Sequence, residues 1–190
     1  MKKFVLTTLA VMAAIGVLAV QPADAKKVQQ DPSMALINMP MNDEIQQVNG
    51  VSKSANKETQ RLSNKLADAT KGMVKKNWKT IYVKAVPVGD KGAVRFYYVD
   101  NRGQVYNGQV IRNTGLSKGK YMAGSMRQTE ALQELVNHLQ RTGQEVPSSI
   151  DIIITQGGYR TKTIFNYDED TSNLTAYQQQ YEQQNFPTMK

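Results

Sequence analysis

The stretch that most constrains this chain is residues 78–100, which has the pattern of a β-hairpin. Apolar and polar residues alternate through two runs, with Ile81 and Val83 in the first and Phe96 in the second. A period of two, rich in β-branched and aromatic residues, is typical of strands that pack one face on a core. Between the runs, residues 89–92 (GDKG) favour the positive φ angles of a tight reversal. We therefore expect an antiparallel hairpin around which the rest of the domain is built.

Two amphipathic helices are predicted on either side of this hairpin. Residues 54–74 carry apolar side chains at helical spacing, and so do residues 125–142. Ser125 and Gln128 have the spacing of a capping box, which would begin the second helix. The glycine-containing stretch at 113–124 is predicted to be a flexible loop before that helix, without the spacing of a phosphate-binding loop.

Three further strands and a terminal helix complete the predicted fold. Residues 105–111 extend the hairpin, residues 149–155 are apolar on both faces and should lie centrally, and residues 159–167 return antiparallel. A last helix over residues 174–185 is ended by Pro187. The order α-β-β-β-α-β-β-α predicts an α+β fold, in which a single antiparallel sheet of about five strands is covered by helices.

The N-terminal residues have the parts of a secretory signal peptide. Lys2 and Lys3 precede a long apolar run, and Ala23-Asp24-Ala25 supplies a small-x-small cleavage site. A retained membrane anchor is the alternative. The expected organisation is a signal peptide at residues 1–25, a flexible leader at 26–50 and a folded domain at 51–190. Because no second long apolar run follows, we expect a periplasmic protein with no stable membrane insertion after cleavage.

Composition limits the chemistry that this chain can perform. The chain has no cysteine, which excludes thiol nucleophiles and Cys-rich zinc sites. Its formal net charge is +8, which is compatible with a nucleic acid, an anionic surface or an acidic protein as partner. The basic residues are scattered, and the densest group is only Lys71, Lys75 and Lys76. We therefore expect no nucleic-acid partner.

The sequence offers little from which to assemble an active site. The single histidine, His138, falls inside the second predicted helix, where a solvated or core-edge role is expected, so no Ser-His-Asp set forms. The acidic run at 168–170 lacks the ligand spacing of a calcium loop. We expect no catalytic residues, no metal site and no cofactor. A hydrolase that uses unpaired carboxylates such as Asp151 or Glu145 is the least favoured alternative.

Tyrosines make binding to another protein the better hypothesis. Aromatic residues and arginine dominate the hot spots of protein interfaces. We expect Tyr98 and Tyr167 to pack the sheet against its helices. Tyr159, Tyr177 and Tyr181 are then the tyrosines available to a partner.

Several short motifs, taken in order along the chain, resemble the YezG-like immunity proteins. They are WKTIYV from Trp78, FYY at 96–98, Tyr106, a leucine-rich helix that closes with TGQ at 142–144, FNYDED at 165–170, and Tyr177 and Tyr181 in a terminal aromatic helix. The resemblance covers residues 54–186. It implies a small α+β protein that neutralises a secreted polymorphic toxin in bacterial competition, by binding it rather than by catalysis.

The resemblance and the export signal together predict a periplasmic immunity protein that binds and neutralises a cognate secreted antibacterial toxin. The residues expected to bind the toxin are the acidic turn and the aromatic and basic residues near it: Asp168, Glu169, Asp170, Tyr159, Arg160, Tyr177 and Tyr181. The alternative is a periplasmic, envelope-associated adaptor or structural protein that binds an anionic surface and shares only the fold. A salt-dependent association would favour the adaptor.

Overall fold

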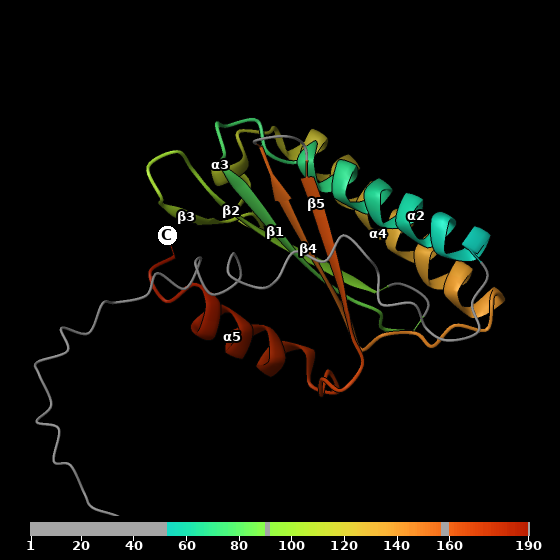
Figure 1. The fold of residues 1–190 in the computed structure, drawn as a ribbon. Coiled ribbons are helices and arrows are strands. Elements are labelled where there is room, and N and C mark those ends of the chain that lie inside the picture. The colour runs from blue at the N-terminus through green and yellow to red at the C-terminus, as the bar shows by residue number, and fades with distance from the viewer. Residues whose placement is uncertain (1–52, 90–91, 157–159, 190) are drawn as a thin grey trace, which may run out of the picture. The chain divides into compact units, whose positions relative to one another are not determined.

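The computed structural model describes residues 53–89, 92–156 and 160–189 (Figure 1). The predicted signal peptide, the predicted leader and Tyr159 lie outside the described residues. In chain order the elements are α2 (Lys53–Lys71), β1 (Thr80–Val86), β2 (Ala93–Val99), β3 (Val105–Asn107), α3 (Ile111–Thr114), α4 (Lys118–Arg141), β4 (Ser149–Thr155), β5 (Arg160–Asn166) and α5 (Leu174–Asn185).

The strands form one antiparallel sheet in the order β3-β2-β1-β4-β5. Helices α2 and α4 cover one face of this sheet, and α5 lies on the other face (Figure 1). The predicted α+β class, with one five-stranded sheet covered by helices, is therefore confirmed. Strand β4 pairs with β1 and β5, which places it inside the sheet, as its apolar character on both faces predicted.

The larger core lies between the sheet and the pair α2 and α4. Alternate residues of the hairpin point into it, as the period of two predicted. Its fully buried members include Ile81, Val83, Phe96, Leu66 of α2 and Leu135 of α4. Burying a side chain of this size stabilises the fold by about 1.5–3 kcal/mol relative to leaving it in water.

A second, smaller core lies under α5 and was not predicted. Tyr82 and Tyr97 occupy the strand positions expected to be solvated, and Phe186 at the end of α5 covers both rings. Consequently every residue of β1 is buried. The hydroxyl of Tyr97 also donates to Oε1 of Glu182 in α5, at 2.8 Å. The prediction of a single packed face was wrong. Helix α5 carries few apolar residues, so its sequence does not indicate that it covers the second face of the sheet.

The structure also corrects the start of α4. This helix begins at Lys118 rather than at Ser125, so most of the predicted loop is helical, and β3 ends at Asn107 instead of continuing to residue 111. The glycine at 124 serves close packing, because a Cβ there would lie 2.0 Å from Sδ of Met73. Gly124 was interpreted as a flexible loop residue, whereas it is a helical residue that allows close contact with Met73.

Two glycines of this region should respond oppositely to the same substitution. A Cβ at Gly108 would lie 2.1 Å from Cε2 of the fully buried Phe96 ring, whereas at Gly119 in α4 nothing lies within 4 Å. We expect Gly108→Ala to lower the free energy of unfolding by about 2 kcal/mol through overpacking. Gly119→Ala should raise it by about 0.5–1 kcal/mol through helix propensity. Urea denaturation measures both, and changes of the same sign would contradict the packing described at Gly108.

Candidate partner-binding site

The α5 face of the sheet carries a buried ion cluster centred on Lys84 of β1, whose side chain is 3% exposed. Its cross-strand neighbour in β4 is Asp151, and directly opposed residues of antiparallel strands have closely spaced side chains. The Lys84 ammonium donates to Oδ2 of Asp151 at 2.9 Å and to Oε2 of Glu169 at 3.1 Å. Glu169 belongs to the turn between β5 and α5. One ammonium is thus shared by a strand carboxylate and a turn carboxylate.

Two tyrosines of α5 cover the side of this cluster that faces the helix. The Tyr177 hydroxyl donates to Oε2 of Glu169 at 2.5 Å, and the Tyr181 hydroxyl donates to Oδ1 of Asp151 at 3.4 Å. Lys84 Nζ lies 5.4 Å and 5.0 Å from the centroids of these two rings, which is cation–π distance. We call Lys84, Asp151, Glu169, Tyr177 and Tyr181 the Lys84 cluster.

Further hydrogen bonds satisfy the carboxylates of the Lys84 cluster. The Ser149 hydroxyl donates to Glu169, and Nδ2 of Asn166 donates to Oδ2 of Asp151 at 2.7 Å. Both donors come from strands β4 and β5. A buried ion pair holds its geometry when its remaining polar atoms are satisfied in this way. The cluster therefore fixes the start of α5 and the preceding turn against the sheet.

The two carboxylates differ in burial, and their pKa values move in opposite directions. Burial raises the pKa of the Asp151 carboxyl, and the charge of Lys84 offsets this only in part. Burial also acts to raise the pKa of Glu169, but hydrogen bonds from Ser149 and Tyr177 and the charge of Lys84 together lower it. The charged form of Glu169 is therefore favoured by its surroundings, whereas that of Asp151 is disfavoured.

The structure separates the predicted binding residues into three groups. Glu169, Tyr177 and Tyr181 meet in the Lys84 cluster, where they contact the protein's own side chains. Asp168 and Asp170 are exposed in the turn between β5 and α5. Nothing tests the predicted binding role of any of these residues, which remains a prediction.

Arg160 forms the third group by itself. It is exposed at the first position of β5, opposite Thr155, whereas the acidic turn follows the other end of the same strand. A strand of seven residues spans roughly 20 Å, so Arg160 and the acidic turn lie at opposite ends of the sheet. Tyr159 lies outside the described residues.

Tyr167 is the residue that the sequence reasoning placed incorrectly. It was expected to pack the sheet against a helix, yet it is 38% exposed. Strand β5 ends at Asn166, so Tyr167 lies in the turn, where its carbonyl accepts a hydrogen bond from the Ser148 hydroxyl at 2.5 Å. The signal that could have found it is its position directly before the acidic residues. We call Tyr167, Asp168 and Asp170 the acidic edge.

The backbone of the acidic edge is ordered by local hydrogen bonds. Oδ1 of Asp170 accepts from the Ser172 amide at 3.0 Å, and Oδ1 of Asn173 caps α5 by accepting from the Ala176 amide at 3.1 Å. Hydrogen bonds from Ser172 lower the pKa of Asp170. The acidic edge therefore presents two carboxylates and an aromatic ring from a turn whose two ends are fixed.

The family model for "Immunity protein YezG-like" matches residues 59–189. The chain belongs to the YezG-like immunity protein family. The resemblance inferred from the sequence motifs is confirmed, and the match includes every described strand together with α4 and α5. No curated protein matches the chain. Family membership indicates an immunity role, for which the partner is in general a toxin and the protein is generally not an enzyme.

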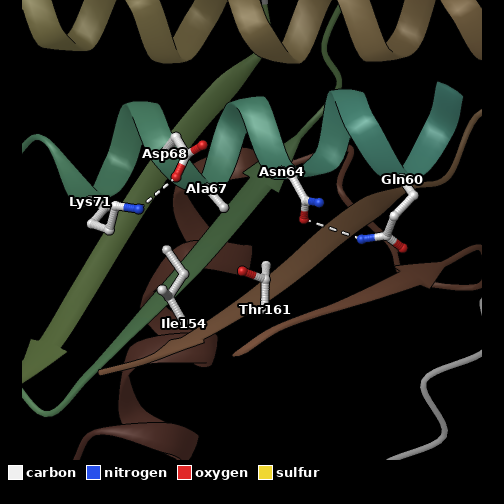
Figure 2. A pocket seen from close by; sticks show the side chains of 7 residues that line it. All are labelled: Gln60, Asn64, Ala67, Asp68, Lys71, Ile154 and Thr161. Carbon is white, nitrogen blue, oxygen red and sulfur yellow. Dashed lines mark hydrogen bonds and ion pairs between the residues drawn. The ribbon is translucent and has the colours of Figure 1, made fainter. Parts of the chain in front are cut away.

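This YezG-like protein also has a hollow of about 290 Å³ between α2 and the strands β4 and β5 (Figure 2). Its charged groups form a pair within α2, in which Lys71 Nζ lies 2.7 Å from Oδ1 of Asp68. Its two amides bond to each other, since Gln60 Nε2 donates to Oδ1 of Asn64 at 3.2 Å. Figure 2 shows these side chains on the side of α2 that faces the strands. The hollow contains none of the predicted binding residues, and its polar groups are not arranged for acid–base or nucleophilic chemistry.

In the described part of the YezG-like protein, no group of three or more His, Cys, Asp or Glu side chains could hold a metal ion. His138 is buried on α4, as expected for a core-edge histidine. No described helix combines the length and the apolar character needed to cross a membrane.

Proposed function

We propose that this YezG-like protein is exported, acts in the periplasm, and neutralises a cognate antibacterial toxin by stoichiometric binding, without turnover. The signal-peptide pattern of residues 1–25 supports the location, and the family match supports the immunity role. The observation that carries the proposal is the acidic edge, where exposed carboxylates and a tyrosine are presented by a turn that the Lys84 cluster fixes to the sheet.

A fixed turn is favourable for tight inhibition. A side chain that is already ordered in the free protein loses little entropy on binding, so more of the contact energy appears as affinity. Glu169 lies between the exposed residues Asp168 and Asp170, and its bond to Lys84 holds the backbone there. Tyr167 supplies an aromatic anchor next to this charge. The toxin surface that fits the acidic edge is therefore positively charged around an apolar depression.

Removing the two exposed charges should weaken toxin binding without unfolding the domain. We expect Asp168→Asn with Asp170→Asn to raise the dissociation constant by at least about tenfold, equivalent to 1.4 kcal/mol. Asparagine retains the side-chain oxygen, and Glu169 stays in place to hold α5. The measurement is titration calorimetry with the cognate toxin, together with the survival of cells that express both proteins.

The matched control removes two exposed carboxylates from α2, Glu58→Gln with Asp68→Asn. Both belong to surface ion pairs within one helix, which contribute little to stability. This variant changes the net charge by the same amount as the variant of the acidic edge. Unchanged affinity in the acidic-edge variant, or equal weakening in both, would exclude the acidic edge as the toxin-binding site.

A further inference from the structure

The first two turns of α4 have an apolar stripe that points to solvent. Gly119, Met122, Ala123 and Met126 follow the i, i+3, i+4, i+7 spacing of one helix face, and all four are exposed. Met122 and Met126 are 54% and 62% exposed. The opposite face of the same turns is buried, through Tyr121, Gly124 and Gln128. This part of α4 therefore has a core stripe and a second, outward stripe.

Exposed cations surround the outward stripe. Lys118, Lys120 and Arg127 flank it on α4, and Lys75, Lys76 and Arg112 lie on the adjoining loop and on α3. The loop is held against α3, since the Lys75 amide donates to the Thr114 carbonyl at 2.9 Å. We call these six cations and the outward stripe the cationic methionine face.

The charges of the cationic methionine face are not neutralised by the described residues. None of its six cations forms an ion pair with a described residue. The first acidic residue along α4 is Glu130, one turn beyond Met126. Placing Lys118 and Lys120 in the first turn of a helix is electrostatically unfavourable, because that end of the helix carries positive partial charge. An anionic partner would relieve this repulsion.

We propose that the cationic methionine face binds the surface of an anionic phospholipid bilayer. An apolar helix stripe with lysine and arginine on both sides suits the boundary between lipid headgroups and acyl chains, where methionines enter and cations meet phosphates. Four of the six cations are lysines, which are depleted at protein–protein interfaces and bind as point charges without bidentate geometry. These features favour a lipid surface over an acidic protein.

This inference goes beyond toxin neutralisation and does not depend on it. The loop carrying Lys75 precedes β1 at one end of the sheet, and the acidic edge follows β5 at the other end. The two surfaces can therefore be occupied together. Two methionines offer little apolar area, so binding is expected to be reversible and dominated by charge.

Vesicle sedimentation tests the proposal with the exported product of the full-length chain. Vesicles contain either phosphatidylcholine alone or phosphatidylcholine with about one third phosphatidylglycerol. We expect binding only to the anionic vesicles, and a loss of about tenfold or more when the salt rises from 50 to 300 mM. Lys118→Glu with Lys120→Glu should abolish this binding, while Gly119→Leu, which enters open space, should strengthen it.

The matched control is Lys57→Glu with Arg141→Glu, which makes the same change in net charge at the far ends of α2 and α4. It should retain the binding. The lysine variant should also unfold at a higher urea concentration than wild type, because it removes repulsion at the start of α4. Equal binding to both vesicles, equal loss in both variants, or binding to an acidic protein without binding to anionic vesicles would overturn the proposal.

Discussion

Replacing Lys84 by methionine should lower the free energy of unfolding by about 3 kcal/mol at pH 7. The variant keeps the apolar part of the side chain and removes the ammonium that Asp151 and Glu169 share. Two partly buried carboxylates, with side chains 16% exposed at Asp151 and 35% at Glu169, are then left without a counter-ion beneath α5. Urea denaturation followed by circular dichroism measures the loss.

The deficit of the Lys84 variant should shrink as the pH falls toward 4. Without the ammonium, the pKa of Asp151 rises further above its ordinary value of 3.8. Burying the ionised Asp151 carboxylate lowers the stability of the variant above that raised pKa. This loss of stability disappears as the pH falls through the raised pKa. In wild type, Glu169 has a lowered pKa, so the stability it contributes is present above about 4.5 and is lost at lower pH. Both effects reduce the difference in the free energy of unfolding between wild type and the Lys84→Met variant as the pH falls.

The control for this prediction is Lys79→Met, which removes an exposed lysine from the start of the same hairpin. Its stability should stay within about 0.5 kcal/mol of wild type at both pH values. A Lys84→Met deficit of the same size at pH 7 and at pH 4 would show that lost packing, rather than unpaired charge, destabilises the protein.

The central strands were predictable from sequence because their side chains alternate with a period of two, and β4 and α5 were found at the expected residues. The Lys84 cluster was not predicted. A lysine between Val83 and Ala85 has the pattern of a solvated position, and nothing in the strand indicates that α5 will cover it. The available signal was a second isolated charge, Asp151, in another largely apolar strand.

Three of the predicted binding residues, Asp168, Glu169 and Asp170, lie in a turn whose sequence has no periodic pattern, and the structure separates them. The turn between β5 and α5 is irregular, so alternation does not tell which of Asp168, Glu169 and Asp170 faces inward. The Glu169 side chain points inward because its carboxylate bonds to Lys84, a residue distant in sequence. Exposure of Asp168 and Asp170 could be expected for an acidic helix start, whereas the anchoring role of Glu169 required the fold.

Replacing Phe186 by alanine should lower the free energy of unfolding by about 3 kcal/mol. The ring is 3% exposed, and its centroid lies 4.6 Å from that of Tyr97 and 5.5 Å from that of Tyr82. Removing it opens a cavity under the last turn of α5 and leaves the helix fixed mainly by the Lys84 cluster. We expect faster amide hydrogen exchange in α5 than in α4, together with a lower urea midpoint.

Phe186 and Lys84 fix the same helix from its two ends, which makes their effects non-additive. Once Phe186→Ala has loosened α5, Lys84→Met should cost less than it does alone, since water can reach the carboxylates. Tyr167→Ala is the aromatic control, because that ring is exposed and its loss should change stability by no more than about 0.5 kcal/mol. Additive losses, or α5 amides that exchange as slowly in the Phe186 variant as in wild type, would show that α5 is held by contacts other than these two.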